Sequence, residues 1–424
     1  MKSLPKHTVF LDFGSFIYTY GPYFETGMYR NIIGIPETNI PVARHYMVSV
    51  ITQDNCQVYY YGSAQETDDT ITSMITLLEE GQEVEDHAAK LYDLLIAPIL
   101  ENIGEDDNLI ISACDLLTRL PFEMLFDVGE SRKRSIEYVS SAKALIKTIK
   151  ANETISQVSV FAEPEYGGVK NALNWTEWEA MSIEDAFERE SSIIPKVYLK
   201  EQATKDRILN AKDSIIHIAT HGFALNKKPT LTQWYEQDEI TKLLRHPNHN
   251  NPMARCGLLF SPSQSDKGIV TGDDILALNL SDTYLVVLSS CQSALGTLEF
   301  NEGVAGLRRA YEISDAHNLI CSLWESDDCA TFLLMSWFYH FLIVGKAGLS
   351  EALNKAKQRI RGITGRQLIQ TAEQFYQDGS TNLAEDLMDK VRASGGQNSH
   401  PFEHPYYWAG FILIRNRFGV AAEG

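Results

Sequence analysis

Residues 284–296, YLVVLSSCQSALG, decide the fold class, because a short apolar run ends there in small and polar residues. The run has no apolar–polar alternation, which is typical of a strand buried on both faces of a sheet. Residues 214–223, SIIHIATHGF, follow the same pattern. The first run ends beside Cys291 and the second beside His221, so two predicted strands lead to side chains that can do chemistry.

Four further runs share this pattern. They are 108–113 (NLIISA), 157–162 (QVSVFA), 318–323 (NLICSL) and 407–414 (YWAGFILI). Amphipathic segments that fit helices separate many of the runs, at 176–190, 203–211, 302–313, 328–344 and 350–361. Alternation of strands and helices predicts an α/β fold, here with a mostly parallel six-stranded sheet flanked by helices.

The N-terminal part of the chain has a different pattern. Residues 46–61 contain two β-rich runs around the polar turn TQDN, which predicts a hairpin, and a helix fits 67–80. Residues 1–45 have no clear periodicity. We therefore expect a β-rich N-terminal extension over 1–87 and a main domain over 88–424. Polar insertions are expected in the main domain near 223–256 and 362–405.

Charge and composition exclude several classes of partner. The 424 residues include 37 basic and 56 acidic side chains, so the net charge is −19, which argues against nucleic acid or an anionic membrane as partner. No run reaches the roughly 18 apolar residues of a membrane-spanning helix. The first residues lack an apolar stretch followed by a small-residue cleavage site, so we expect no secretory signal. The six cysteines form no C-x-x-C pair, so we expect reduced thiols in the cytoplasm.

The predicted Cys–His pair is the strongest candidate site. Ligands of open α/β sheets bind at the carboxyl ends of the strands, where Cys291 and His221 are expected to meet. A thiol needs a neighbouring base to become a nucleophile, and Gly222 leaves room for a substrate beside its N–H group. Taken singly, Cys291 also fits a small buried residue and His221 a hydrogen-bonded strand end. His217, in mid-strand, is predicted to be a buried, hydrogen-bonded core residue.

Acidic residues follow two other predicted strands. Asp115 follows 108–113, and Glu325, Asp327 and Asp328 follow 318–323, so we expect all of them at the same edge as His221. These acids fit the negative wall of a pocket for a basic side chain. The three later acids equally fit the N-terminal cap of the helix at 328–344.

A metal site or a cofactor is not expected. His246, His249 and Cys256 lack a fourth ligand and lie in a loop-like stretch, and a structural turn suits His400 and His404 better than ligation. The glycines of EGVAG fit neither a phosphate-binding loop nor a dinucleotide fingerprint.

Several separated motifs resemble one known family. They are HIATHGF at 217–223, TGDDILALNLSDTYLVVLSSCQSALG at 271–296, EGVAGLRRAY at 302–311, CSLWESDD at 321–328 and HPYYWAGFILI at 404–414. Together they resemble the CHAT-domain proteases, which are caspase-like cysteine peptidases of clan CD, similar to separase. The resemblance implies a caspase-like fold without a cofactor.

The resemblance also implies residue roles. His221 matches the catalytic histidine, Cys291 the nucleophile, and the N–H groups of Gly222 and Cys291 the oxyanion hole. The stretch WESDD is similar to the separase segment that reads an arginine before the cleaved bond, which favours a basic P1 residue; a medium-sized apolar P1 residue is the alternative.

The expected function is therefore a cysteine endopeptidase that cleaves a protein partner at limited sites. An activating or regulatory protein partner is expected, and bacterial antiviral defence or cell-death signalling is the implied setting. The alternatives are a non-catalytic CHAT-fold scaffold that binds a protein in the same cleft, and a small-molecule hydrolase or acyltransferase with the same dyad.

Overall fold

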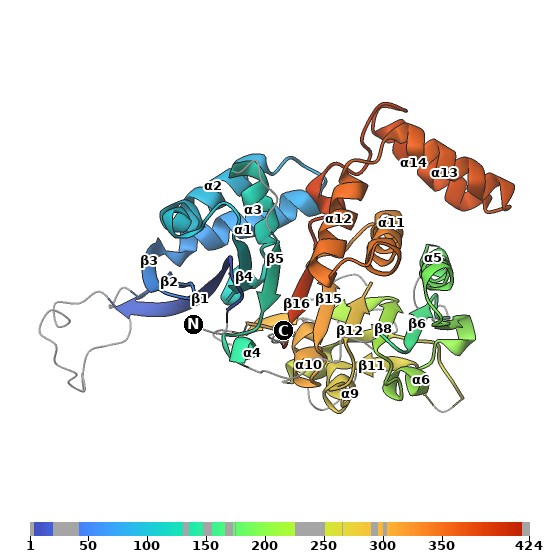
Figure 1. The fold of residues 1–424 in the computed structure, drawn as a ribbon, viewed down its shortest axis with the longest axis horizontal. Helices are drawn as coiled ribbons and strands as arrows, with labels where there is room; N and C mark the ends of the chain where they lie inside the picture. The colour runs from blue at the N-terminus through green and yellow to red at the C-terminus, as the bar shows by residue number, and fades with distance from the viewer. Residues whose placement is uncertain are drawn as a thin grey trace, which may run out of the picture.

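An 11-stranded sheet forms the centre of the protein, and helices cover both of its faces (Figure 1). The computed structural model describes residues 4–19, 42–129, 135–146, 155–165, 173, 175–224, 251–264, 266–289, 296–299 and 303–417. The strands lie in the order β3 (Cys56–Ser63), β2 (Val42–Ile51), β1 (Thr8–Thr19), β4 (Asn108–Ser112), β5 (Ile136–Val139), β16 (Phe411–Arg415), β15 (Asn318–Ser322), β12 (Leu285–Leu288), β8 (Ile215–Ala219), β6 (Val158–Ala162) and β7 (Lys196–Leu199). The α/β class is confirmed, and the sheet contains the six predicted strands together with five more.

The sheet reverses its strand direction between β15 and β16. Strands β15, β12, β8, β6 and β7 are parallel to one another. Strand β16 is antiparallel to β15 but parallel to β5, which is parallel to β4. The carboxyl ends of β4 and β5 therefore lie at the edge opposite to those of β8 and β12. This single antiparallel pairing decides which residues can share a site.

The helices flank the two halves of the sheet. They are α1 (Ala64–Glu79), α2 (Glu85–Leu95), α3 (Phe122–Gly129), α4 (Lys143–Ile146), α5 (Thr176–Glu190), α6 (Lys205–Leu209), α9 (Gly272–Leu276), α10 (Leu307–Ile313), α11 (Asp328–Tyr339), α12 (Leu349–Arg361), α13 (Gly365–Gln377) and α14 (Thr381–Ala393). Figure 1 shows α5, α11 and α12 on one side of β6, β8, β12 and β15, and α6, α9 and α10 on the other. Strands covered on both faces have no solvent side, which explains their continuous apolar sequences.

The N-terminal strands continue the same sheet. The predicted hairpin is present as β2 and β3, and the helix after it is α1. Strand β1 had no clear sequence signal, yet it pairs with β2 on one side and with β4 on the other. Pairing with β4 joins β1, β2 and β3 to the rest of the sheet through backbone hydrogen bonds.

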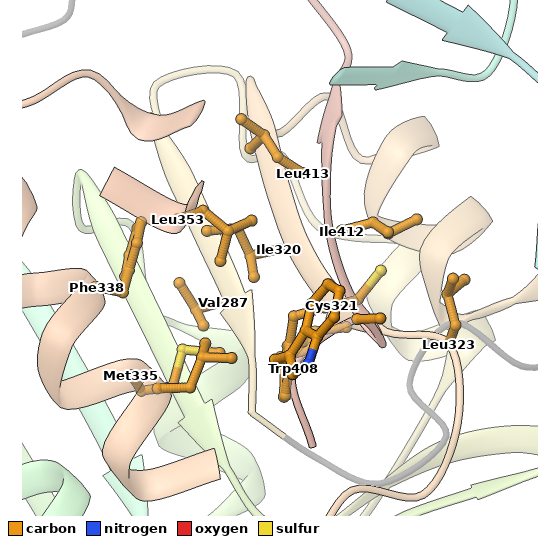
Figure 2. Packing of buried hydrophobic residues seen from close by; sticks show 14 of the residues in the cluster. Val287, Ile320, Cys321, Leu323, Met335, Phe338, Leu353, Trp408, Ile412 and Leu413 are labelled. Atoms are coloured by element: carbon orange, nitrogen blue, oxygen red, sulfur yellow. The ribbon is translucent and has the colours of Figure 1, made fainter. Parts of the chain in front are cut away.

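Buried side chains of β12 and β15 pack against the helices of one layer. Figure 2 shows Val287 and Ile320 pointing toward Phe338 of α11 and Leu353 of α12. Val287 and Ile320 are fully buried. Burial of large aliphatic side chains of this kind contributes roughly 1.5–3 kcal/mol each to folding.

The junction between β15 and β16 depends on one tryptophan and one glycine. Trp324 is fully buried, and its indole N–H donates a hydrogen bond of 2.9 Å to the carbonyl of Tyr406. A Cβ on Gly410 would lie 2.8 Å from Trp324 Cε2, so only glycine fits beside this ring. The ring and the glycine hold the start of β16 against the end of β15.

The predicted insertion at 362–405 is a pair of helices, α13 and α14, which protrudes beside α5 and α11 (Figure 1). Phe375 of α13 packs edge-on against Trp178 of α5, with ring centroids 4.7 Å apart. Trp175 Nε1, just before α5, donates a hydrogen bond of 2.8 Å to Asp386 of α14. Of the other predicted insertion, residues 225–250 lie outside the described ranges.

Truncation of Ile320 tests the importance of the central strands. We expect Ile320→Ala to lower the free energy of unfolding by about 2–5 kcal/mol, because it leaves a cavity between the sheet and α11. Ile194→Ala is the matched control, since Ile194 is 77% exposed and its truncation should change little. Urea denaturation measures both variants, and equal stability of the two would contradict this packing.

Candidate active site

His221 lies at the carboxyl end of the buried strand β8. The preceding Thr220 is buried, and its hydroxyl donates a hydrogen bond to the carbonyl of Leu259. The backbone carbonyl of His221 accepts a hydrogen bond of 2.9 Å from the N–H of Leu259. Gly222 begins β9 (Gly222–Ala224), which pairs with β10 (Cys256–Leu259). The backbone at His221 is therefore fixed between the main sheet and a small second sheet.

Strand β12 brings its own carboxyl end to the same place. The parallel ladder pairs Leu288 with Ile218, and the N–H of Ser289 donates 2.9 Å to the carbonyl of Ile218. Ser289 is buried, with 4% of its surface exposed. Cys291 lies two positions further along the chain, within residues 290–295, which are outside the described ranges. The role of Cys291 stays a prediction.

A pocket lies at this edge of the sheet. Thr220 and Ser289 line it from the sheet, and Asp328 lines it from the start of α11; its cavity volume is about 10 Å³. A cavity of this size holds about one water molecule. Burial, together with the neighbouring carboxylates of Asp327 and Glu179, raises the pKa of Asp328 to about 7. The carboxyl group of Asp328 thus changes its charge close to neutral pH.

The other two acids of this segment have different surroundings. Asp327 is the N-cap of α11 and accepts a hydrogen bond of 2.9 Å from the N–H of Ala330. Its second oxygen lies 2.6 Å from Lys390 Nζ of α14. Glu325 is exposed. The helix-capping interpretation therefore applies to Asp327, and Asp328 is the acid that lines the pocket.

Asp115 does not lie at this edge, and the expectation that it does is wrong. It follows β4, whose carboxyl end lies at the opposite edge of the sheet because β16 and β15 are antiparallel. Asp115 instead accepts a hydrogen bond of 2.5 Å from Arg44, which also pairs with Asp68 of α1. Its charge is used to hold the N-terminal strands to the main domain.

His217 is a buried, hydrogen-bonded core residue, as predicted. No part of its side chain is exposed, and its ring lies between two partners. Nε2 lies 2.8 Å from Oε1 of Glu179, and Nδ1 lies 3.1 Å from the hydroxyl of Tyr339. Glu179 itself is only 1% exposed and lines the pocket next to Asp328.

The strands and helices of this site belong to one recognised domain family. The sequence matches the CHAT domain over residues 85–416. The chain belongs to the CHAT-domain family. Within this CHAT domain lie β8, β12, β15 and α11, which are the elements that form the pocket.

The CHAT domain also has more distant similarities. The human (Homo sapiens) tetratricopeptide repeat protein 28 is 22% identical over 362 residues, which cover 76% of this chain and 13% of that protein. Two crystal structures of the Saccharomyces cerevisiae separase–securin complex are also similar. The 3.0 Å structure has a TM-score of 0.39 and 12% identity over 73% of this chain and 15% of that chain. The 2.6 Å structure has a TM-score of 0.37 and 11% identity. This match covers 76% of this chain and 18% of that chain.

Glu179 is the pocket residue of the CHAT domain that sequence analysis missed. Helix α5 buries Ala180, Ile183 and Phe187 on one face, and Glu179 lies on that same face. The sequence signal for this residue was a glutamate on the apolar face of an amphipathic helix. A buried acid requires a hydrogen-bonding or charged partner, so this position indicates a buried polar contact. That partner is His217, which the sequence placed in the core for a separate reason.

The described ranges contain no group of three or more side chains suited to hold a metal ion. His246 and His249 lie outside those ranges, and Cys256 is buried in β10. His404 donates from Nε2 to the carbonyl of Gln82 at 2.9 Å and belongs to a structural turn. Every helix within the described part of the chain is too short or too polar to span a bilayer.

Substitution of Asp327 tests its role as a cap. Asp327→Ala should lower the free energy of unfolding by about 0.5–2 kcal/mol, because the N–H of Ala330 loses its acceptor. Asp327→Asn retains a capping oxygen and should lose less. Glu325→Ala, two residues earlier and exposed, should change stability by less than about 0.5 kcal/mol. Urea denaturation measures the free energy of unfolding of the three variants. A value for Asp327→Ala equal to that of the wild type would contradict the capping role.

Proposed function

We propose that this protein is a cysteine endopeptidase in which His221 and Cys291 form the catalytic dyad. The observation that carries the proposal is the register of two strands. In the β8–β12 ladder, paired residues differ by 288 − 218 = 70 positions. The same difference separates the proposed dyad, since 291 − 221 = 70. Each residue thus follows a paired strand position by three residues, which supports their assignment to one dyad.

The proposed mechanism follows from these residue types. His221 helps to keep Cys291 as a thiolate, whose sulfur attacks the carbonyl carbon of the scissile peptide bond. The N–H groups of Gly222 and Cys291 stabilise the oxyanion that forms. His221 then gives a proton to the leaving amine as the C–N bond breaks. Water, deprotonated by His221, hydrolyses the thioester and regenerates the thiol.

The raised pKa values of four other cysteines support Cys291 as the nucleophile. Burial raises the pKa of Cys114, Cys256 and Cys321 to about 12, and it raises that of Cys329 well above the ordinary value. These four thiols stay protonated at neutral pH, and a protonated thiol is a poor nucleophile. Cys56 is exposed on β3 in the N-terminal region.

The proposed substrate is a protein cleaved at limited sites after a basic residue. Asp328 supports a basic P1 residue, because its carboxyl group lies at the same edge of the sheet as the end of β8. We place the enzyme in the cytoplasm, where a catalytic thiol stays reduced. The proposal includes an activating or regulatory protein partner. It also includes a role in bacterial antiviral defence or cell-death signalling. They rest on membership of the CHAT-domain family.

Substitution of the dyad tests the activity. Cys291→Ala and His221→Ala should each lower kcat/KM on a peptide library by about 10³-fold or more, because the attacking group or its base is lost. Cys56→Ala is the control and should retain activity. Equal cleavage by wild type and Cys291→Ala would sink the peptidase proposal. A protein that cleaves nothing but binds a partner in the same cleft would favour the scaffold alternative.

The pH dependence of P1 preference tests the role of Asp328. Its pKa of about 7 means that the carboxyl group is neutral below this pH and charged above it. The ratio of kcat/KM for P1 arginine to P1 leucine should therefore rise through pH 7, and the titrations of the dyad cancel in this ratio. The charged groups that act on Asp328 are Asp327, Glu179, Asp386 and Glu325. Of these, Glu179 contacts His217 and Asp327 contacts Lys390. A wild-type ratio that is independent of pH, or an unchanged rise in Asp328→Asn, would contradict this role.

A further inference from the structure

We infer that a cavity between α2, α3, α12 and the segment before β16 binds a basic segment of a protein partner. The cavity has a volume of about 480 Å³, and pockets for organic ligands commonly measure about 300–1,000 Å³. It shares no lining residue with the small pocket at Asp328. The inference goes beyond the proposed function, because this binding needs neither His221 nor Cys291.

Four parts of the chain meet at this cavity. Glu83 and Glu85 line it from the residues around the start of α2, and Met124 lines it from α3. Arg361 lines it from the end of α12, and Trp408 lines it from the segment that leads into β16. The cavity therefore lies where helices of the N-terminal part of the chain meet its C-terminal part. Junctions between parts of a protein are common places for ligands.

The buried part of the cavity wall is apolar. It consists of Val84, Ala88, Met124 and Trp408, all of which are buried. The indole ring of Trp408 is held in place, because its Nε1 donates a hydrogen bond of 2.9 Å to the carbonyl of Glu403. Apolar side chains of this kind suit the methylene stem of a lysine or arginine, which packs on apolar surface while its charged end stays in water.

The exposed part of the wall carries three carboxylates. Glu83, Glu85 and Glu403 line the cavity and are exposed. Oε2 of Glu85 accepts a hydrogen bond of 3.0 Å from the N–H of Val84. Among the described residues, no Lys, Arg or His nitrogen lies within 4.0 Å of any of these three carboxylates. Ion pairs within the described part of the protein therefore do not neutralise their charges.

The other polar groups of the wall leave this excess of negative charge in place. Arg361 contributes one positive charge, and the N-terminus of α2 contributes about half of one. Nε2 of His404 donates to the carbonyl of Gln82 at 2.9 Å, and its Nδ1 accepts from the N–H of Tyr406 at 3.3 Å. A neutral imidazole satisfies both contacts. The three carboxylates thus outweigh the positive charge of the described wall, and the cavity attracts cations.

The placement of the acids favours an extended ligand with several charges. The described ranges contain no group of three acidic, histidine or cysteine side chains suited to hold a metal ion. One ion pair with an exposed carboxylate contributes only about 0.2–1 kcal/mol, so a ligand with a single charge gains little. A basic peptide segment can contact several carboxylates and the apolar wall together. The net charge of −19 makes a second copy of this chain a poor partner.

Calorimetry on the Cys291→Ala protein tests this binding separately from catalysis. The probe is acetyl-Lys-Leu-Lys-Leu-Lys amide, and its control has glutamine in place of each lysine. At about 0.15 M salt, which screens distant charges, the lysine peptide should bind at least about tenfold more tightly. Spermidine has the same three charges without the peptide and should bind at least about fivefold more weakly than the lysine peptide. Equal binding of the two peptides, or of spermidine and the lysine peptide, would overturn the inference. If the lysine peptide binds as expected while the wild type cleaves nothing, the inference stands and the peptidase proposal fails.

Two double variants in the same background locate the binding site. Glu83→Gln/Glu403→Gln removes two charges from the cavity wall, and Glu188→Gln/Glu190→Gln removes two charges from exposed positions at the end of α5. The first should weaken binding of the lysine peptide at least about fivefold, and the second less than about twofold, because screened distant charges matter little. Equal weakening by the two double variants would show that the overall negative charge alone attracts the peptide, and would overturn the inference.

Two arginines at the end of α12 provide a test with the opposite sign. Arg361 stacks on Trp408 with its Cζ 5.1 Å from the ring centroid, and Arg359 stacks on Trp337 at 4.8 Å. Of the two arginines, Arg361 lines the cavity. Arg361→Gln removes positive charge from the wall and should tighten binding of the lysine peptide about two- to fivefold, whereas Arg359→Gln should change it less. Unchanged or weaker binding by folded Arg361→Gln would overturn the inference, and thermal unfolding confirms that each variant is folded.

Discussion

The parallel pairing of β8 with β12 is the constraint on which the proposed site depends. Hydrogen bonds of the ladder fix the carboxyl ends of both strands at one level, up to the bond between Ser289 and Ile218. Because a strand alternates its side chains, a slip of one residue would turn every buried side chain of β12 to the other face. All four residues of β12 are buried, so the packing on both faces opposes such a slip. The core therefore fixes the register, and the register determines where β8 and β12 end.

The sequence was informative for the strands with continuous apolar runs, whereas the buried strand β5 was not predicted. Continuous apolar runs identified β4, β6, β8, β12, β15 and β16, and helix periodicity identified α5 from Thr176 to Glu190. Membership of the CHAT-domain family agrees with the motifs that suggested it. The roles of His221, Gly222 and Cys291, and the division of the chain near residue 87, stay predictions.

What the sequence did not reveal was mostly the direction of strands. A short apolar run has the same pattern whether its strand is parallel or antiparallel, so the reversal at β16 was not predictable from the pattern. That reversal moved Asp115 to the far edge, where Arg44 pairs with it. Strand β1 was missed because it lacks regular alternation, although its pairing with β4 joins both parts of the sheet. The polar stretch after residue 362 gave no indication that α14 would pair Lys390 with Asp327.

The central claim is that Cys291, activated by His221, is the nucleophile of a peptidase that prefers a basic P1 residue. Its most direct test is reaction with a peptidyl acyloxymethyl ketone that carries arginine at P1, followed by tandem mass spectrometry of the labelled protein. The account predicts a single adduct on Cys291 that forms much more slowly when citrulline replaces the arginine. An adduct on Cys56 or another cysteine, or equal labelling by the two probes, would contradict it.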